Sequence, residues 1–271
     1  MHILRLGNSA DTFPGVPEEA RSWSITARAV EAATGEPVET TFRHLWPAEE
    51  LPGLIESWIV RYQPDVVIFW VNGYWFTYVE LPEARRSNRG IVKAAGRFAA
   101  RARLKKALVY RVGKVRRQVQ VWRGVGREFF EPEDIIALNE SVIRRVLQHE
   151  EVSLIVRGPV YPNVTILNRS MLARGEVRRR IVDRALEALC AQLHVPYIGE
   201  ADGLAYIGQK YLCDDGLHPN EKAHLRMAAE ETEEILKIWR ASGRTGSGGP
   251  EEGTAGPVEV STRTGAPNDG S

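Results

Sequence analysis

Two short segments near opposite ends of the chain carry the residue types that nucleophilic catalysis needs. Gly7-Asn8-Ser9 directly follows an apolar run, and Asp215-Gly216-Leu217-His218 precedes the last amphipathic stretch. A serine hydroxyl attacks an acyl carbonyl when a base takes its proton, and a carboxylate bound to imidazole Nδ1–H leaves Nε2 free as that base. We therefore predict that Ser9, His218 and Asp215 are the nucleophile, the base and the orienting carboxylate.

Attack on a carbonyl also requires hydrogen-bond donors for the oxyanion that develops. Asn72 comes directly after the segment Asp65–Val71, which predicts a buried strand because Val66–Val71 is continuously apolar. In a parallel α/β sheet, ligands bind beyond the carboxyl ends of the strands. We expect the Asn72 side-chain NH₂ and the Ser9 backbone N–H to be the two oxyanion donors.

Aromatic residues crowd the segment after Asn72. Tyr74, Trp75 and Phe76 lie where we expect the loop that borders the site, and there they can line an apolar acyl pocket. Packing in the core is the alternative for these side chains.

The catalytic candidates also have structural explanations. Ser9 is a favoured residue for capping a following helix, and Asn72 can satisfy the backbone of a turn. His218 can be a surface turn residue, or a metal ligand together with the neighbouring aspartates and His224. The spacing of the two histidines fits no common zinc pattern, so we predict no metal.

Strand-like and helix-like segments alternate along the chain, which indicates a mostly parallel sheet covered on both faces. Strands are predicted over His2–Leu6, Val38–Leu45, Asp65–Val71, Val152–Val156 and Pro196–Ile198, and helices over Pro17–Ala33, Ala48–Tyr62, Pro132–His149, Glu176–Leu193 and Pro219–Ala241. The expected fold is α/β, a three-layer α/β/α sandwich with about five strands.

A basic segment interrupts this pattern. From Arg85 to Arg127 the chain has 15 Lys and Arg and no Asp or Glu. Basic residues at every fourth position predict an amphipathic helix, and Leu108–Trp122 predicts a hairpin. We interpret about residues 80–130 as an insertion. It can be a solvated face, can dock on an anionic membrane surface or, with less support, can bind nucleic acid.

Composition sets the remaining bounds. The net charge is +1, hydrophobic residues make up 43% of the chain, and no apolar run is long enough to span a membrane. The first residues show no secretory pattern and there are two cysteines, Cys190 and Cys213, which favours a cytoplasmic protein with free thiols. Residues 242–271 are rich in Gly, Ser, Thr and Pro and are expected to be disordered, which leaves one domain over residues 1–241.

The motifs together resemble those of the SGNH (GDSL-like) hydrolases. Gly7-Asn8-Ser9 resembles the family's Gly-Asp-Ser nucleophile motif, and Asp215-Gly216-Leu217-His218 matches its Asp-x-x-His block. Asn72 resembles its oxyanion asparagine, although Trp70-Val71-Asn72-Gly73 replaces the usual Gly-x-Asn-Asp. The family's oxyanion glycine has no counterpart near Phe42–Glu50. The resemblance covers about residues 1–240 apart from the insertion, and it implies an α/β/α sandwich that hydrolyses acyl esters without a cofactor.

The function predicted from the sequence is therefore a serine ester hydrolase, an esterase or lipase, whose partner is a small-molecule or lipid acyl ester. Two alternatives stay open. An acyltransferase would use the same residues with an acceptor alcohol in place of water. A non-catalytic protein would use the basic segment to bind an anionic surface or nucleic acid.

Overall fold

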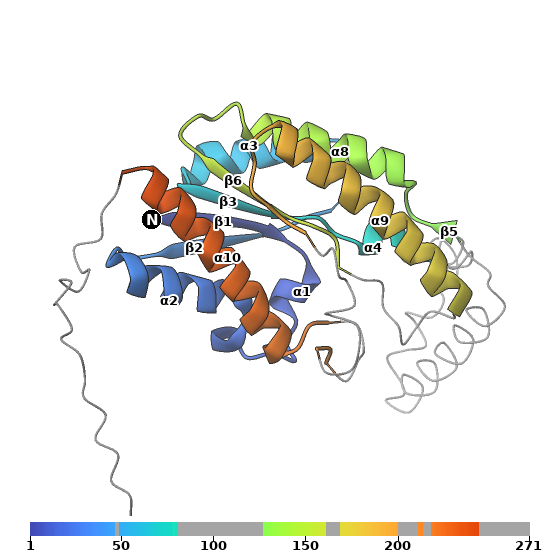
Figure 1. Ribbon diagram of the computed structural model, residues 1–271, viewed down its shortest axis with the longest axis horizontal. Helices are drawn as coiled ribbons and strands as arrows, with labels where there is room; N and C mark the ends of the chain where they lie inside the picture. Colours follow the sequence, from blue (N-terminus) through green and yellow to red (C-terminus); the bar gives the residue numbers. More distant parts are fainter. Residues whose placement is uncertain are drawn as a thin grey trace, which may run out of the picture.

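A five-stranded sheet forms the centre of the molecule (Figure 1). The computed structural model describes residues 1–46, 49–77, 79–80, 127–160, 169–199, 211–213 and 218–243. The strand order is β2-β1-β3-β6-β7, and every neighbouring pair is parallel. The strands are β1 (His2–Gly7), β2 (Glu39–His44), β3 (Val66–Trp70), β6 (Ser153–Arg157) and β7 (Tyr197–Ile198). The prediction of a mostly parallel five-stranded sheet is confirmed.

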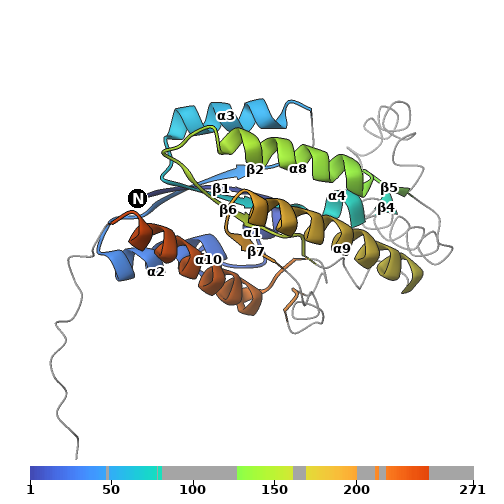
Figure 2. The ribbon, with the colours of Figure 1, turned by 45° about the horizontal axis from the view of Figure 1, so that its top comes forward.

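Helices cover both faces of this sheet. Figure 2 shows one helical layer above the sheet and one below it. The first layer holds α3 (Leu51–Tyr62), α8 (Pro132–Val146) and α9 (Arg169–Gln192), and the second holds α2 (Ser22–Thr34) and α10 (Glu221–Ala241). The architecture is thus the expected three-layer α/β/α sandwich.

The alternation of side chains along the strands explains the two layers. Leu4 and Leu6 of β1 pack in the larger core cluster, with residues of α3, α8 and α9. Ile3 of the same strand packs on the opposite face, against Val30 of α2 and Ile235 of α10. A parallel sheet buried on both faces needs apolar residues at nearly every strand position, which is why β3 reads as a continuous apolar run.

The predicted helix boundaries differ by five residues or more in two places. A 3₁₀ turn, η1 (Glu18–Ala20), precedes α2, so the α-helix begins at Ser22 rather than at Pro17. Helix α9 begins at Arg169, earlier than the predicted Glu176. Two four-residue helices, α1 (Ser9–Thr12) and α4 (Tyr74–Thr77), lie where the sequence predicts loops. Such short helices bury too few periodic positions to leave a pattern.

A small antiparallel pair marks the base of the expected insertion. β4 (Val79–Glu80) pairs with β5 (Arg127–Glu128), so the chain leaves and rejoins the domain at adjacent points. Arg178 of α9 donates to the carbonyl oxygens of Phe76 and Phe130, one on each side of this pair. The predicted basic helix and hairpin, and the predicted disordered tail from residue 244 on, lie outside the described residues.

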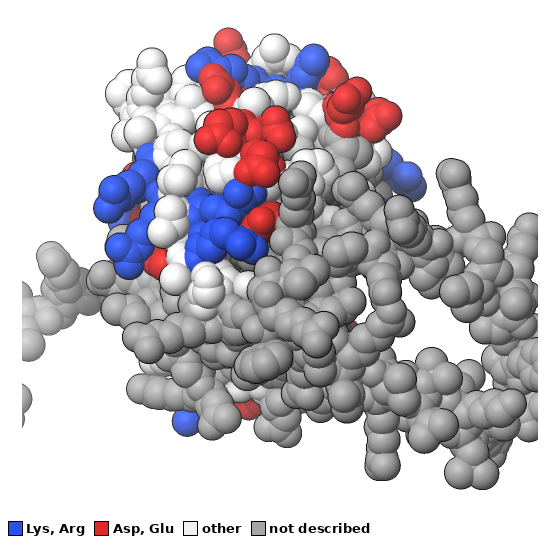
Figure 3. All heavy atoms as spheres, turned by 90° about the vertical axis from the view of Figure 1, so that its right-hand side faces the viewer, with Lys and Arg blue, Asp and Glu red and all other residues white. Residues whose placement is uncertain are grey.

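Figure 3 looks at the side of the molecule on the right of Figure 1. In its described part, basic and acidic side chains lie next to one another, so neither sign of charge covers that part alone. None of the helices in the described ranges is long and apolar enough to cross a membrane.

Candidate active site

The point where the strand order reverses lies between β1 and β3. Within the sheet, β2 lies next to β1 on one side and β3 lies next to β1 on the other side. In doubly wound sheets this position opens a crevice at the carboxyl edge. Leu6 of β1 pairs with Phe69 of β3, and Ser9 and Asn72 each follow three residues later. The fold therefore brings these two candidates to the same crevice.

Ser9 is the first residue of α1 and its side chain is exposed. Asn8 caps this helix: its Oδ1 accepts from Ala10 N–H at 2.9 Å, and its own N–H donates to Asp11 Oδ2 at 3.2 Å. Asn8, not Ser9, is thus the capping residue, which leaves the Ser9 hydroxyl outside that role. Among the described residues, no acceptor meets the Ser9 N–H.

His218 reaches the serine from the other end of the chain. Its Nε2 lies 3.2 Å from Ser9 Oγ, a hydrogen-bond distance between residues that are 209 positions apart. A backbone bond from Cys213 N–H to the His218 carbonyl, at 2.8 Å, holds the histidine in place. Asn220 then caps α10, because its Oδ1 accepts from Lys222 N–H and Ala223 N–H. The predicted nucleophile and base are therefore brought together.

Asp215 lies outside the described residues, in the stretch 214–217. The two ends of that stretch are tied to each other, by the bond from Cys213 to His218 and by the bridge between Leu212 and Pro219. The role of Asp215 as the orienting carboxylate stays a prediction.

Asn72 fills the turn role that the sequence allowed for it, while its oxyanion role stays a prediction. Its Oδ1 accepts from Tyr74 N–H at 3.0 Å and so starts α4. The oxygen is occupied in this way, and the amide NH₂ is the end of the side chain that can donate to a ligand. The neighbouring Gly73 packs against the segment that follows β6, because a Cβ on it would lie 3.0 Å from the Val160 carbonyl oxygen.

The structure corrects the expectation for the aromatic segment. Trp75 and Phe76 are buried in the larger core cluster, with exposed fractions of 2% and 0%. They pack against other apolar side chains because α4 turns them inward. Tyr74 is exposed and lies beside Phe129, with ring centroids 5.7 Å apart. Of the three predicted pocket residues, only Tyr74 is placed to meet a ligand from solvent.

A buried network of charges holds α1 and α10 to the sheet. Arg5 of β1 donates to Asp11 of α1 and to Glu231 of α10, both at 2.6 Å. Arg157 of β6 donates to the second oxygen of Glu231 at 3.0 Å. All four side chains are fully buried. Since α1 begins with Ser9 and α10 follows His218, this network fixes the two segments that carry these residues relative to each other.

The network shifts the pKa values of its two carboxyl groups. Burial raises the pKa of Glu231, but Arg5 and Arg157 outweigh burial and hold that pKa below its ordinary value. Burial raises the pKa of Asp11 above its ordinary value, against the opposite effect of Arg5. Both carboxyl groups have a structural role, because they pair with buried arginines beneath the crevice.

His224 is a buried histidine six residues after His218. Its Nδ1 accepts from Ser22 N–H at 3.1 Å, so the neutral ring carries its proton on Nε2. Burial, together with Arg5, lowers its pKa to about 4. His224 therefore joins α10 to the start of α2 as a neutral side chain. In the described ranges, no three His, Cys, Asp or Glu side chains gather to hold a metal.

Two aromatic residues on the carboxyl side of the sheet were missed from the sequence. The Phe13 ring stacks on the His218 imidazole, with centroids 4.0 Å apart and an angle of 5° between the planes. Trp46 follows β2 at the same carboxyl edge and is 64% exposed. Trp46 could have been found as an aromatic just past a predicted strand, whereas Phe13 had no signal beyond lying four residues after Ser9.

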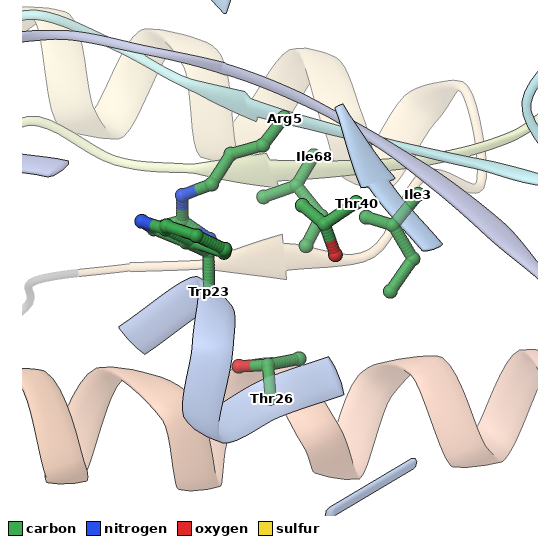
Figure 4. A pocket seen from close by; sticks show the side chains of 6 residues that line it. All are labelled: Ile3, Arg5, Trp23, Thr26, Thr40 and Ile68. Carbon is green, nitrogen blue, oxygen red and sulfur yellow. The ribbon is translucent and has the colours of Figure 1, made fainter. Parts of the chain in front are cut away.

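A narrow space on the face of the sheet that α2 covers is not a substrate site. It lies between the sheet and α2 (Figure 4) and has no room for a water-sized sphere. Its lining residues are Ile3, Arg5, Trp23, Thr26, Thr40 and Ile68.

The sequence matches no protein-family model and no curated protein. Solved structures do match. One, described as TesA, has a TM-score of 0.53 at 12% identity over 87% of this chain and 99% of its own. A G-D-S-L family lipolytic protein from Veillonella parvula scores 0.52 at 15% identity, over 88% of this chain and 99% of its own. The chain has the fold of the SGNH hydrolases.

A third match is a psychrotrophic esterase, EstA from Pseudoalteromonas sp., which in that structure is inhibited by monoethylphosphonate. Its TM-score is 0.52 at 11% identity, over 88% of this chain and 98% of that one. At these identities the SGNH likeness is one of fold, and the chemistry of the present chain rests on its own residues.

Proposed function

We propose that the protein is a serine hydrolase of carboxylic esters. The observation that carries the proposal is the 3.2 Å contact between Ser9 Oγ and His218 Nε2, at the strand-order reversal of an SGNH-like sheet. A serine beside an unprotonated imidazole nitrogen can lose its proton as it attacks.

The reaction proceeds in two halves. Ser9 Oγ attacks the ester carbonyl while His218 Nε2 takes the hydroxyl proton, and the oxyanion accepts hydrogen bonds from Ser9 N–H and Asn72 NH₂. His218 returns the proton to the leaving alkoxide, and Asp215 orients the imidazole from Nδ1. A water, deprotonated by His218, then releases the acyl group from Ser9.

Substrate preference follows from what borders the crevice. Trp46 and Tyr74 are exposed aromatic side chains that follow strands β2 and β3 at the carboxyl edge of the sheet, and they offer flat apolar surface to an acyl or alcohol group. The basic segment from Arg85 to Arg127 favours substrates presented on an anionic surface. Sedimentation with phosphatidylglycerol vesicles at low and high salt tests that preference; no salt-sensitive binding would remove it.

Hydrolysis of p-nitrophenyl esters, from acetyl to long acyl chains, tests the proposed activity. Ser9→Ala and His218→Ala should each abolish turnover, because the hydroxyl and its base act as one unit. The matched control is Ser57→Ala, which removes an exposed serine hydroxyl from α3 and should leave turnover unchanged. Full turnover by Ser9→Ala would contradict the proposal.

A further inference from the structure

The imidazole of His218 lies flat on the phenyl ring of Phe13. Their centroids are 4.0 Å apart and their planes are 5° from parallel. Phe13 ends α1, the helix whose first residue is Ser9. The stack therefore connects the proposed base to the helix that carries its nucleophile.

Phe13 is itself held firmly. Its carbonyl oxygen accepts from Val16 N–H at 3.2 Å and from Arg21 Nη2 at 3.4 Å. The ring also packs against the backbone of Gly15, where a Cβ would lie only 2.3 Å from ring atom Cε1. The ring is thus enclosed by His218 on one face and by Gly15 at one edge.

The geometry of the base explains what such a contact can do. The acceptor lone pair of Nε2 lies in the imidazole plane, so a tilt of that plane turns it away from Ser9 Oγ. A parallel stack resists tilting but permits motion within the plane. After proton transfer, the imidazolium faces the negative surface of the phenyl ring, which attracts a cation.

We propose that Phe13 is a positioning residue for His218: it keeps the imidazole plane directed so that Nε2 points at Ser9 Oγ, and it receives the imidazolium on its ring face. The effect on rate rests on the proposed ester hydrolysis. Phe13 acts only through His218 and does not contact the reacting carbonyl.

Two substitutions of Phe13 test whether its aromatic ring, and not only its apolar volume, is needed. Phe13→Leu keeps an apolar side chain and removes the ring, and it should lower kcat about tenfold with KM within twofold of the wild type. Phe13→Tyr keeps the ring and should restore kcat to within about twofold. Wild-type kcat in Phe13→Leu, or equal losses in the two variants, would overturn the proposal.

Gly15→Ala tests the same contact without changing either ring. Gly15 does not have a positive φ, so alanine fits the backbone, but its Cβ must displace the Phe13 ring. We expect kcat to fall as in Phe13→Leu, and the double variant Gly15→Ala/Phe13→Leu should lose no more than Phe13→Leu alone. Additive losses would show that Gly15 does not act through the ring.

A measurement without substrate distinguishes failure of this proposal from failure of the proposed function. In protein with ¹³C-labelled histidine, the ring current of Phe13 should shift the His218 Hε1 signal upfield. Phe13→Leu should move that signal downfield and increase the mobility of the ring in ¹³C relaxation, while Phe13→Tyr should not. An unchanged His218 signal in Phe13→Leu overturns the positioning role even if the protein hydrolyses esters. Changed signals in a protein that hydrolyses none support the contact and contradict the proposed function.

Discussion

Arg5 of the first strand donates a 2.6 Å hydrogen bond to Glu231 of the last helix, and both side chains are fully buried. The pair joins the two ends of the chain beneath the crevice where Ser9 and His218 meet. Burying two charges is costly, and removing one partner leaves the other without compensation. The stability of the domain and the alignment of the segments that carry Ser9 and His218 therefore depend on the same contact.

Glu231→Gln tests this dependence. Without the carboxylate, Arg5 and Arg157 lose their shared counter-ion, and we expect the free energy of unfolding to fall by about 3 kcal/mol. Urea denaturation measures the loss. Glu233→Gln removes an exposed carboxylate from the same helix and should leave the denaturation midpoint unchanged. An equal response of the two variants would mean that the buried network contributes nothing particular to stability.

His224 should make stability depend on pH. Its pKa is about 4 in the folded protein and about 6.5 when unfolded, so the unfolded state binds more protons between these values. Stability contributed by His224 is complete above pH 6.5 and is lost as the pH falls to 4, by about 3 kcal/mol.

His224→Asn keeps an acceptor for Ser22 N–H but cannot titrate. Urea denaturation at a series of pH values should show a shallower dependence for this variant than for the wild type between pH 6.5 and 4. Parallel curves would contradict the assignment of His224 as a neutral buried group.

Asn72→Asp separates the two roles of that side chain. Aspartate can still accept from Tyr74 N–H, so α4 should form and thermal stability should change little. The donor to the oxyanion is lost, and kcat should fall by about 10²- to 10³-fold on p-nitrophenyl esters. If stability collapses while the remaining folded enzyme keeps its kcat, Asn72 serves the fold alone.

The two cysteines should differ sharply in reactivity. Burial raises the pKa of the Cys190 thiol to about 12, whereas Cys213 is half-buried next to the site. Because the thiolate is the reactive form, one thiol should react with DTNB at pH 8 in the native protein and the second only after unfolding. Cys213→Ser should remove the fast reaction, and loss of the slow one instead would reverse the assignment.

The parts of the fold that were predictable from sequence are those with strong periodicity. The apolar run Val66–Val71 indicated a strand buried on both faces, which the structure confirms as β3, and its end located Asn72 at the carboxyl edge. The pairing of Ser9 with His218 came from residue types and motif spacing, since no local pattern relates positions 209 apart.

The parts that sequence did not predict depend on tertiary contacts. Arg5 lies in a strand as a charged residue among apolar ones, and only Asp11 and Glu231 explain its burial. Trp75 and Phe76 turn into the core because Asn72 starts a short helix that has too few residues to show a period. The Phe13 stack likewise needs α1 and the segment before α10 to be placed first.

Covalent labelling with a phosphonate ester tests the central claim most directly, because it needs the activated serine but no knowledge of the natural substrate. The protein, incubated with a p-nitrophenyl phosphonate, should gain one adduct by intact mass, and peptide mapping should place it on Ser9. His218→Ala should slow labelling strongly, and Ser57→Ala should not. An adduct on another residue, or labelling of Ser9 at the same rate in His218→Ala, would contradict a hydrolase built on the contact between Ser9 and His218.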